Sequence, residues 1–281
     1  MEDVMRTRMK ELAFEMPESI RRTGFKRLRR LVTPVLLCCA FGQILRGQLD
    51  HPMQNDFPAK DFTLALIKYE GGSYHHVRGE MLAHEEQFLP NMLESLRNTQ
   101  GLHVSDRPEI VKLGDKKLFD SPIFFITGHY RFPIGDREID QIREFIKRGG
   151  FVYIEDCGGL DQYLKIYGSF FDQMHEVLQK AFPEGRFVVL SEDHDIYKHP
   201  YSFPKGLPNF FGRNNDGRPP DTPGKIRKHK GGEGFYVANV MVAFLGDGDT
   251  CCGWSGNSLS GNEPFKMAAN VIIYAMTHGG L

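Results

Sequence analysis

Residues 121–159 show two continuous apolar runs separated by a stretch with helical periodicity. The runs begin at Ser121 and Phe151, and continuous apolar runs are typical of strands buried on both faces of a parallel sheet. Between them, apolar residues recur three and four positions apart from 139 to 146, and Gly149-Gly150 is a typical helix stop. The pattern therefore predicts a strand–helix–strand unit.

The same patterns predict the remaining elements. Strands are expected at 62–69, 109–113 and 186–190, a hairpin at 234–239 and 240–245, and helices at 86–100, 170–182 and 263–277. Strands alternating with helices predict an α/β fold, a three-layer αβα sandwich with a mostly parallel sheet. Residues 191–234 are rich in Pro, Gly, Asn, Asp and His without periodicity, which predicts a long loop that is functional or disordered.

The chain begins with a segment unlike the rest. A basic cluster from Lys26 to Arg30 precedes a mostly apolar, uncharged run at 31–45. The run is too short to span a bilayer comfortably but fits the apolar core of a secretory signal. We therefore expect residues 1–45 to be a signal peptide or short hydrophobic leader, 46–61 a linker and 62–281 a single domain. An exported or cell-envelope protein is predicted, with an uncleaved membrane anchor or a cytosolic N-terminal helix as alternatives.

Charge and cysteine content narrow the possible partners. The formal net charge of the chain is −1. Residues 1–42 contain more basic than acidic side chains, so the rest of the chain is acidic. It has no Lys/Arg-rich stripe, which argues against nucleic acid as a partner. Cleavage would leave only Cys157, Cys251 and Cys252. Three cysteines do not make a disulfide framework; at most one bond from Cys157 to Cys251 or Cys252 is expected, and free thiols are favoured.

Polar residues follow both strands of the strand–helix–strand unit. Gly128-His129 follows the first and Asp156-Cys157 the second. Ligands of open parallel sheets bind at the carboxyl ends of the strands, so this edge is the predicted site. Cys157 is a candidate nucleophile with His194 as a candidate partner, because a thiolate near a histidine and helix amides has a lowered pKa. The alternative is a small buried residue that fills a tight corner.

A divalent metal is the second possibility for this edge. Imidazole and carboxylate ligands suit zinc, manganese or iron, and the candidate ligands are His129, Asp156, Asp193 and His194. The alternative is that Asp156 and Asp193 accept hydrogen bonds from loop amides and that the histidines lie exposed in a loop. The absence of a two-histidine helix signature weakens the metal interpretation. Trp254, the only tryptophan, lies in a glycine-rich loop; it is a candidate stacking platform for a sugar or another planar ligand, or else it caps the core.

Several short motifs, in this order and spacing, resemble the bacterial family known as domain of unknown function four-one-five-nine. They span about residues 62–281: Tyr69-x-Gly71-Gly72, Thr127-Gly128-His129, Arg148-Gly149-Gly150-Phe151, Glu155-Asp156-Cys157-Gly158-Gly159, Glu192-Asp193-His194 with Tyr197, and Cys252-Gly253-Trp254-x-Gly256. The resemblance implies a flavodoxin-like sheet similar to that of class I glutamine amidotransferases, and cell-envelope membership in many relatives. It implies no activity. The glycine two residues before the amidotransferase cysteine is missing before Cys157, so glutaminase activity is not expected.

Two functions remain open. The first is a module that binds a polar small molecule, a carbohydrate or an envelope protein partner, with Gly71, Gly72, Gly128, His129, Asp156, Gly158 and Trp254 as predicted contacts. The second is a hydrolase at the same edge, using metal-activated water or the Cys157 thiolate. Binding is favoured, because the catalytic groups do not form a complete recognisable set.

Overall fold

The computed structural model describes residues 62–70, 81–157, 161–208, 231–255 and 262–278. All of them belong to the second of the two units into which the chain divides, Met53–Leu281. The predicted leader at 1–45 and linker at 46–61 lie outside the described residues. Within the described ranges, no helix has the length and apolar character that a membrane crossing requires.

The core of the domain is a seven-stranded sheet in the order β2-β1-β3-β4-β7-β6-β5. Neighbouring strands from β2 to β7 are parallel, whereas β6 is antiparallel to both β7 and β5. This confirms the predicted α/β class and mostly parallel sheet. The strands are β1 (Leu64–Ile67), β2 (Glu109–Val111), β3 (Ile123–Gly128), β4 (Phe151–Asp156), β5 (Arg186–Val189), β6 (Glu233–Val237) and β7 (Val240–Gly246).

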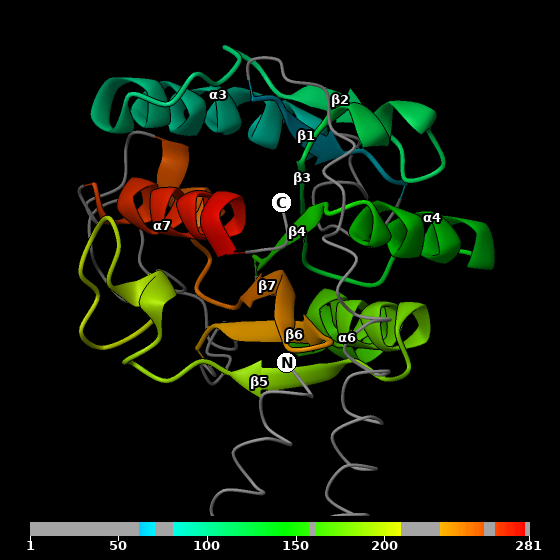
Figure 1. The fold of residues 1–281 in the computed structure, drawn as a ribbon. Helices are drawn as coiled ribbons and strands as arrows, with labels where there is room; N and C mark the ends of the chain where they lie inside the picture. The colour runs from blue at the N-terminus through cyan, green and yellow to red at the C-terminus, as the bar shows by residue number, and fades with distance from the viewer. Residues whose placement is uncertain (1–61, 71–80, 158–160, 209–230, 256–261, 279–281) are drawn as a thin grey trace, which may run out of the picture. The chain divides into compact units, whose positions relative to one another are not determined.

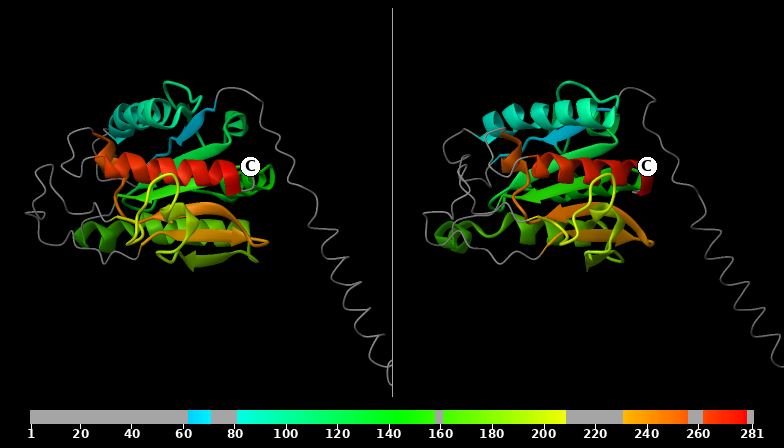
Figure 2. Two further views of the ribbon diagram at one scale, coloured as in Figure 1. Left: turned by 60° about the vertical axis from the view of Figure 1, so that its left-hand side comes forward. Right: turned by 90° about the vertical axis from the view of Figure 1, so that its left-hand side faces the viewer.

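Helices pack against both faces of this sheet. In Figure 1, α3 (Met81–Gln100) and α7 (Glu263–His278) lie to the left of the strands, and α4 (Asp136–Lys147) and α6 (Phe170–Ala181) lie to the right. Figure 2 shows α3 and α7 in front of the strands in its right-hand view. Because side chains alternate along a strand, Leu64 and Leu66 face one hydrophobic cluster and Ala65 and Ile67 the other.

The α4 segment shows how local sequence fixes an element. Its buried residues Ile139, Ile142, Phe145 and Ile146 form the predicted apolar stripe. The helix ends where Gly149 takes a φ of 90°, a left-handed conformation that favours glycine. The N–H of Gly150 donates to the carbonyl of Phe145 at 3.0 Å, and the N–H of Gly149 donates to that of Ile146, a Schellman motif. The chain then enters β4 at Phe151.

Shorter elements complete the domain. They are α5 (Asp161–Tyr167) and the 3-10 turns η2 (Lys116–Asp120), η3 (Asp195–Tyr197) and η4 (Cys251–Ser255). The predicted hairpin is present between β6 and β7, where Ala238 and Asn239 both have positive φ, as in a type I′ turn. The predicted loop at 191–234 contains η3 and is described as far as residue 208.

The strand order places a topological switch between β1 and β3. The connection from β1 to β2 runs through α3 on one face, and the connection from β3 to β4 runs through α4 on the opposite face. The two connections therefore diverge from the carboxyl ends of β1 and β3. Such divergence creates the crevice in which open α/β sheets bind ligands.

Candidate functional site

A pocket lies at this switch point. It has a cavity volume of about 1130 Å³, and its walls are formed by residues 68–70, 112–116, 132–135 and 137–138. The first three segments follow β1, β2 and β3, and the last belongs to the first turn of α4. The pocket is thus built from the carboxyl ends of three parallel strands and from a helix N-terminus.

Basic side chains outnumber acidic ones around this pocket. Lys68, Lys112, Lys116 and Arg137 line it, against three carboxylates. Two of the carboxylates are held by the backbone: Asp115 accepts the N–H of Lys117 at 3.0 Å, and Glu138 accepts that of Gly135 at 3.0 Å. None of the four basic residues forms an ion pair with another residue in the described ranges. The lining therefore has a formal charge of +1, from four basic and three acidic side chains, on a domain that is acidic overall.

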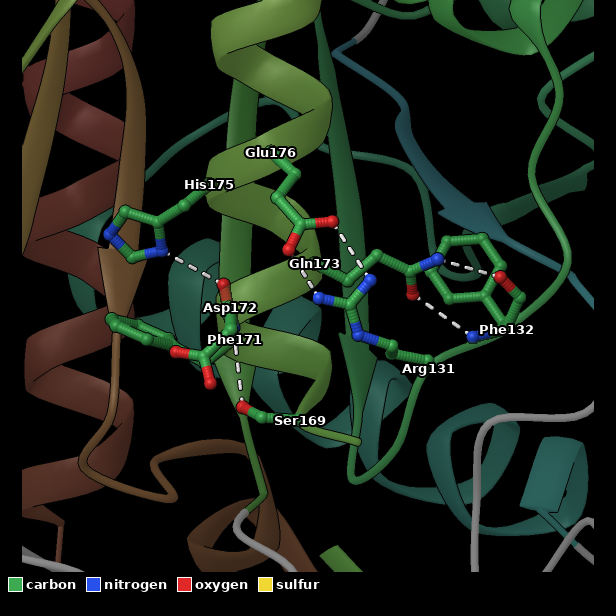
Figure 3. A network of polar contacts seen from close by, with 8 residues as sticks. All are labelled: Arg131, Phe132, Ser169, Phe171, Asp172, Gln173, His175 and Glu176. Atoms are coloured by element: carbon green, nitrogen blue, oxygen red, sulfur yellow. Dashed lines mark hydrogen bonds and ion pairs between the residues drawn. The ribbon is translucent and has the colours of Figure 1, made fainter. Parts of the chain in front are cut away.

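One wall of the pocket is fixed by polar contacts to α6. The buried side chain of Gln173 donates to the carbonyl of Phe132 at 2.7 Å and accepts its N–H at 2.9 Å. Next to it, Arg131 forms a two-pronged ion pair with Glu176, and Figure 3 shows these contacts side by side. Because Gln173 hydrogen-bonds both the N–H and the carbonyl of Phe132, the backbone position at which the lining residues 133–135 begin is fixed.

Tyr69 lines the pocket and packs closely against Gly128 of β3. The Tyr69 ring packs against Phe132, with ring centroids 4.1 Å apart, and its hydroxyl donates to the carbonyl of Thr127. A Cβ atom at Gly128 would lie 2.4 Å from the Tyr69 hydroxyl and 2.7 Å from the Phe170 ring. Glycine is therefore required at 128 so that these aromatic side chains can approach the backbone. Gly128 therefore has a packing role, and its predicted ligand contact stays a prediction.

A second group of side chains occupies the carboxyl ends of β4 and β7. The sulfurs of Cys157 and Cys251 are 2.9 Å apart, and the Thr127 hydroxyl lies 2.9 Å from the first and 3.5 Å from the second. Together with Cys252 and Asp249, these cysteines form a group whose possible ligand atoms all lie within 4.8 Å of one another. We call Cys157, Asp249, Cys251 and Cys252 the cysteine cluster.

Contacts inside the cysteine cluster shift the pKa values of its thiols in different directions. The pKa of Cys251 is lowered, because Cys157 and Cys252 hydrogen-bond to its sulfur. The pKa of Cys157 is raised by its contacts with Cys251 and Cys252 and by burial. A nucleophilic cysteine needs a lowered pKa, so the environment of Cys157 opposes the predicted nucleophilic role. Cys251 is the thiol that ionises most readily.

Glu155 is buried directly beneath the cysteine cluster. Burial raises its pKa to about 8, although hydrogen bonds from Tyr153 and Thr250 lower it. The Tyr153 hydroxyl lies 2.9 Å from the carboxyl group, and the N–H of Thr250 donates to it at 3.4 Å. At neutral pH the carboxyl group is mostly protonated, so it adds little negative charge beneath the sulfurs.

The residues predicted as metal ligands are not brought together. Within the described ranges, His129, Asp156, Asp193 and His194 do not form a group with mutual ligand distances. His194 accepts the N–H of Ile196 through Nδ1 at 3.2 Å and contacts the Tyr236 hydroxyl through Nε2 at 3.1 Å. The Cys157 thiol contacts the Cys251 sulfur and the Thr127 hydroxyl, so the predicted Cys157–His194 pair is not joined either. After β5 the chain packs against α7, where the His194 ring contacts that of Tyr274.

The other predicted contacts have mixed outcomes. Trp254 is 1% exposed, donates from Nε1 to the carbonyl of Pro264 at 3.2 Å and packs against Phe125; it is a core residue here and offers no ring face to a ligand. Asp156 is buried and His129 is half-buried with its ring near Tyr130. Gly71, Gly72 and Gly158 lie outside the described residues.

Comparison with known proteins places the chain in a family. The family model described as Domain of unknown function (DUF4159) matches residues 63–276, which is most of the chain and nearly all of the domain. The chain belongs to the DUF4159 family. Among curated proteins, none matches it. In this DUF4159 domain the motifs after β3, after β4 and after β7 all lie at the carboxyl edge of the sheet.

The sequence pattern allowed one bond from Cys157 to Cys251 or Cys252, but it did not predict that all three cysteines and Asp249 form one group of possible metal ligands. Adjacent cysteines at 251 and 252 follow a predicted strand, as Cys157 does, and this was the available signal. It does not show that β4 and β7 are neighbours, because five elements separate them along the chain. The pairing of Ile154 with Leu245 in the sheet is what brings the two strand ends together.

Proposed function

We propose that this DUF4159 domain is a binding module that holds a polar small molecule with an anionic group in the pocket after β1, β2 and β3. The observation that carries the proposal is the position of the pocket at the topological switch point, where open α/β sheets bind their ligands. Four basic side chains border it, and two of them, Lys68 and Lys112, directly follow β1 and β2.

The lining suits a ligand with two kinds of surface. Lys68, Lys112 and Arg137 attract an anion, and the first-turn N–H groups of α4 have no intrahelical acceptors. Phe132, Pro133 and Ile134 supply apolar area on the same wall. Ligand pockets combine a mostly apolar lining with a few polar groups that fix orientation. Binding is favoured over hydrolysis because the raised pKa of Cys157 opposes a thiolate nucleophile.

The proposal extends to the cellular setting and to fold kinship. Export to the periplasm or cell envelope is supported by the basic cluster and apolar run at 26–45, and sequencing the mature N-terminus after secretion tests it. Kinship with the three-layer, flavodoxin-like sandwich of class I glutamine amidotransferases is supported by helices on both faces of the sheet. Superposition of an experimental structure of this domain on those enzymes tests the proposed similarity of fold.

Calorimetric titration of the full chain tests the proposed binding. The probes are pyrophosphate, glucose 1-phosphate and uncharged glucose. Both phosphate-bearing probes are expected to bind, and Lys68→Glu with Lys112→Glu is expected to weaken them at least about tenfold, or 1.4 kcal/mol. Lys147→Glu, at the far end of α4, is the matched control and should leave binding unchanged. Binding of glucose alone would refute an anion site and favour a carbohydrate ligand. If no probe binds, the anion site is also refuted, and a protein partner is favoured.

A further inference from the structure

The cysteine cluster has a composition that the proposed binding pocket does not explain. It joins three thiols and one carboxylate from three separate places in the fold: Cys157 at the end of β4, Asp249 in the loop after β7, and Cys251 with Cys252 in η4. It is the one group of possible metal ligands found among the described residues. Its position is separate from the pocket, because none of its four members lines that cavity.

We propose that the cysteine cluster is a zinc site in which Cys157, Cys251, Cys252 and Asp249 are the four protein ligands. Thiolates and carboxylates are ordinary zinc ligands, and four protein ligands form a closed tetrahedral site of the structural type. The inference goes beyond the pocket and stands whether or not the pocket binds an anion.

The distances fit a tetrahedral ion. With zinc–sulfur bonds of about 2.3 Å, sulfurs in a tetrahedral site lie about 3.8 Å apart. The four ligand atoms lie within 4.8 Å of one another, so a central ion needs only small side-chain shifts. One such shift is a separation of the Cys157 and Cys251 sulfurs from 2.9 Å by roughly 0.9 Å.

The surroundings also resemble those of a metal site. Thr127 places its hydroxyl within hydrogen-bonding distance of the sulfurs of Cys157 and Cys251, and outer groups of this kind orient metal ligands. Asp249 has a φ of 55°, a left-handed conformation that is uncommon for residues other than glycine and clusters at functional sites. Cys157 and Cys251 are buried, whereas Cys252 is exposed, so an ion has a route to the ligands.

A disulfide between Cys157 and Cys251 is the main competing explanation. Such a bond needs sulfurs about 2.05 Å apart, and it would use only two of the four converging groups. It gives no role to Cys252 or Asp249. Zinc accounts for all four, and the carboxylate favours zinc over copper(I), which prefers soft sulfur ligands.

Zinc at this position would join two segments that are distant in sequence. Cys157 lies at the end of β4, and Cys251 begins η4, whose Trp254 carbonyl accepts a hydrogen bond from Asn91 of α3 at 3.0 Å. The ion would therefore fix η4 against the sheet and, through η4, support the packing of α3. A structural role follows, in contrast to the metal-activated water considered from the sequence.

The test is elemental analysis of the untagged full chain, purified under reducing conditions without chelators. One zinc ion per chain is expected in the wild type. Cys251→Ser and Cys252→Ser are expected to lose the ion, with affinity falling by more than the about 10- to 100-fold that outer-shell changes cost. Asp247→Asn is the matched control: Asp247 lies in the same loop and accepts the N–H of Gly231 at 3.1 Å, but it is outside the cluster, so zinc should be retained.

Cobalt substitution keeps the proposal testable if the Cys251 variant does not fold. Cobalt(II) added to the metal-free wild type should give the intense thiolate charge-transfer absorption of a sulfur-rich tetrahedral site, and Cys252→Ser, changed at an exposed position, should weaken it. The proposal is overturned if the reduced wild type contains no zinc and gives no such absorption. Zinc retained in both serine variants, copper in place of zinc, or a Cys157–Cys251 disulfide in the native protein would also overturn it.

Discussion

The carboxyl edge of the sheet carries two regions that differ in almost every physical respect. The pocket after β1, β2 and β3 is open and bordered by lysines. In the cysteine cluster after β4 and β7, Cys157 and Cys251 are buried members of a hydrophobic core cluster, and burial raises the pKa of the neighbouring Glu155 to about 8. Position at a strand end therefore does not determine what a residue does. Burial separates a region that stabilises the fold from one that can meet a solute.

The largest expected effect concerns Trp254. Trp254→Ala should lower the free energy of unfolding by about 3–5 kcal/mol, because a fully buried indole leaves a cavity. Urea denaturation measures this change. Ile134→Ala, in the half-buried wall of the pocket, is the comparison and should cost only about 1 kcal/mol. Unchanged stability together with weakened ligand binding in Trp254→Ala would instead restore the stacking platform predicted from sequence.

Removal of zinc is expected to have the next largest effect. A ligand present at 100 to 1,000 times its dissociation constant stabilises the folded state by about 3–4 kcal/mol. Urea denaturation with excess zinc and with a chelator should differ by this amount in the wild type. Cys252→Ser should show little difference between the two conditions. A chelator effect of equal size in wild type and variant would mean that the ion acts elsewhere.

Ionic strength should separate the two regions further. Binding of pyrophosphate to the exposed lysines should weaken several-fold between low and high salt, because salt screens exposed charges. The affinity for zinc should change much less with salt, since the ion would be held by coordinate bonds to the protein and not by attraction to exposed charges. Parallel calorimetric titrations at two salt concentrations measure both. A salt-independent pyrophosphate affinity would contradict attraction by Lys68 and Lys112.

The smallest expected effect is a pH dependence at His194, which belongs to neither region. Burial lowers the pKa of His194, so the unfolded chain binds this proton more readily than the folded one. Stability should therefore decline as the pH falls below the ordinary histidine value and through the lowered one. His194→Asn keeps a side-chain acceptor for the N–H of Ile196 and should flatten that decline. Urea denaturation from neutral to mildly acidic pH measures the slope; an equal slope in both proteins would remove His194 as its cause.

The sequence predicted the elements better than it predicted the sites. Continuous apolar runs and the Gly149-Gly150 stop depend on neighbouring residues, and β3, α4 and β4 follow them closely. The cysteine cluster depends on the pairing of β4 with β7, which no local pattern specifies. His194 is the opposite case. It follows a predicted strand, so the sequence predicts it at the carboxyl edge with the other strand ends, but in the structure it contacts Tyr236 and Tyr274.

The pocket and the cysteine cluster are expected to act independently, and one set of calorimetric titrations distinguishes them. Pyrophosphate is titrated into the wild type, Lys112→Glu and Cys252→Ser. The account predicts equal affinity for the wild type and Cys252→Ser, and at least about tenfold weaker binding for Lys112→Glu. Binding that is lost in Cys252→Ser but retained in Lys112→Glu would contradict the account, because the cysteine cluster and not the pocket would then hold the anion.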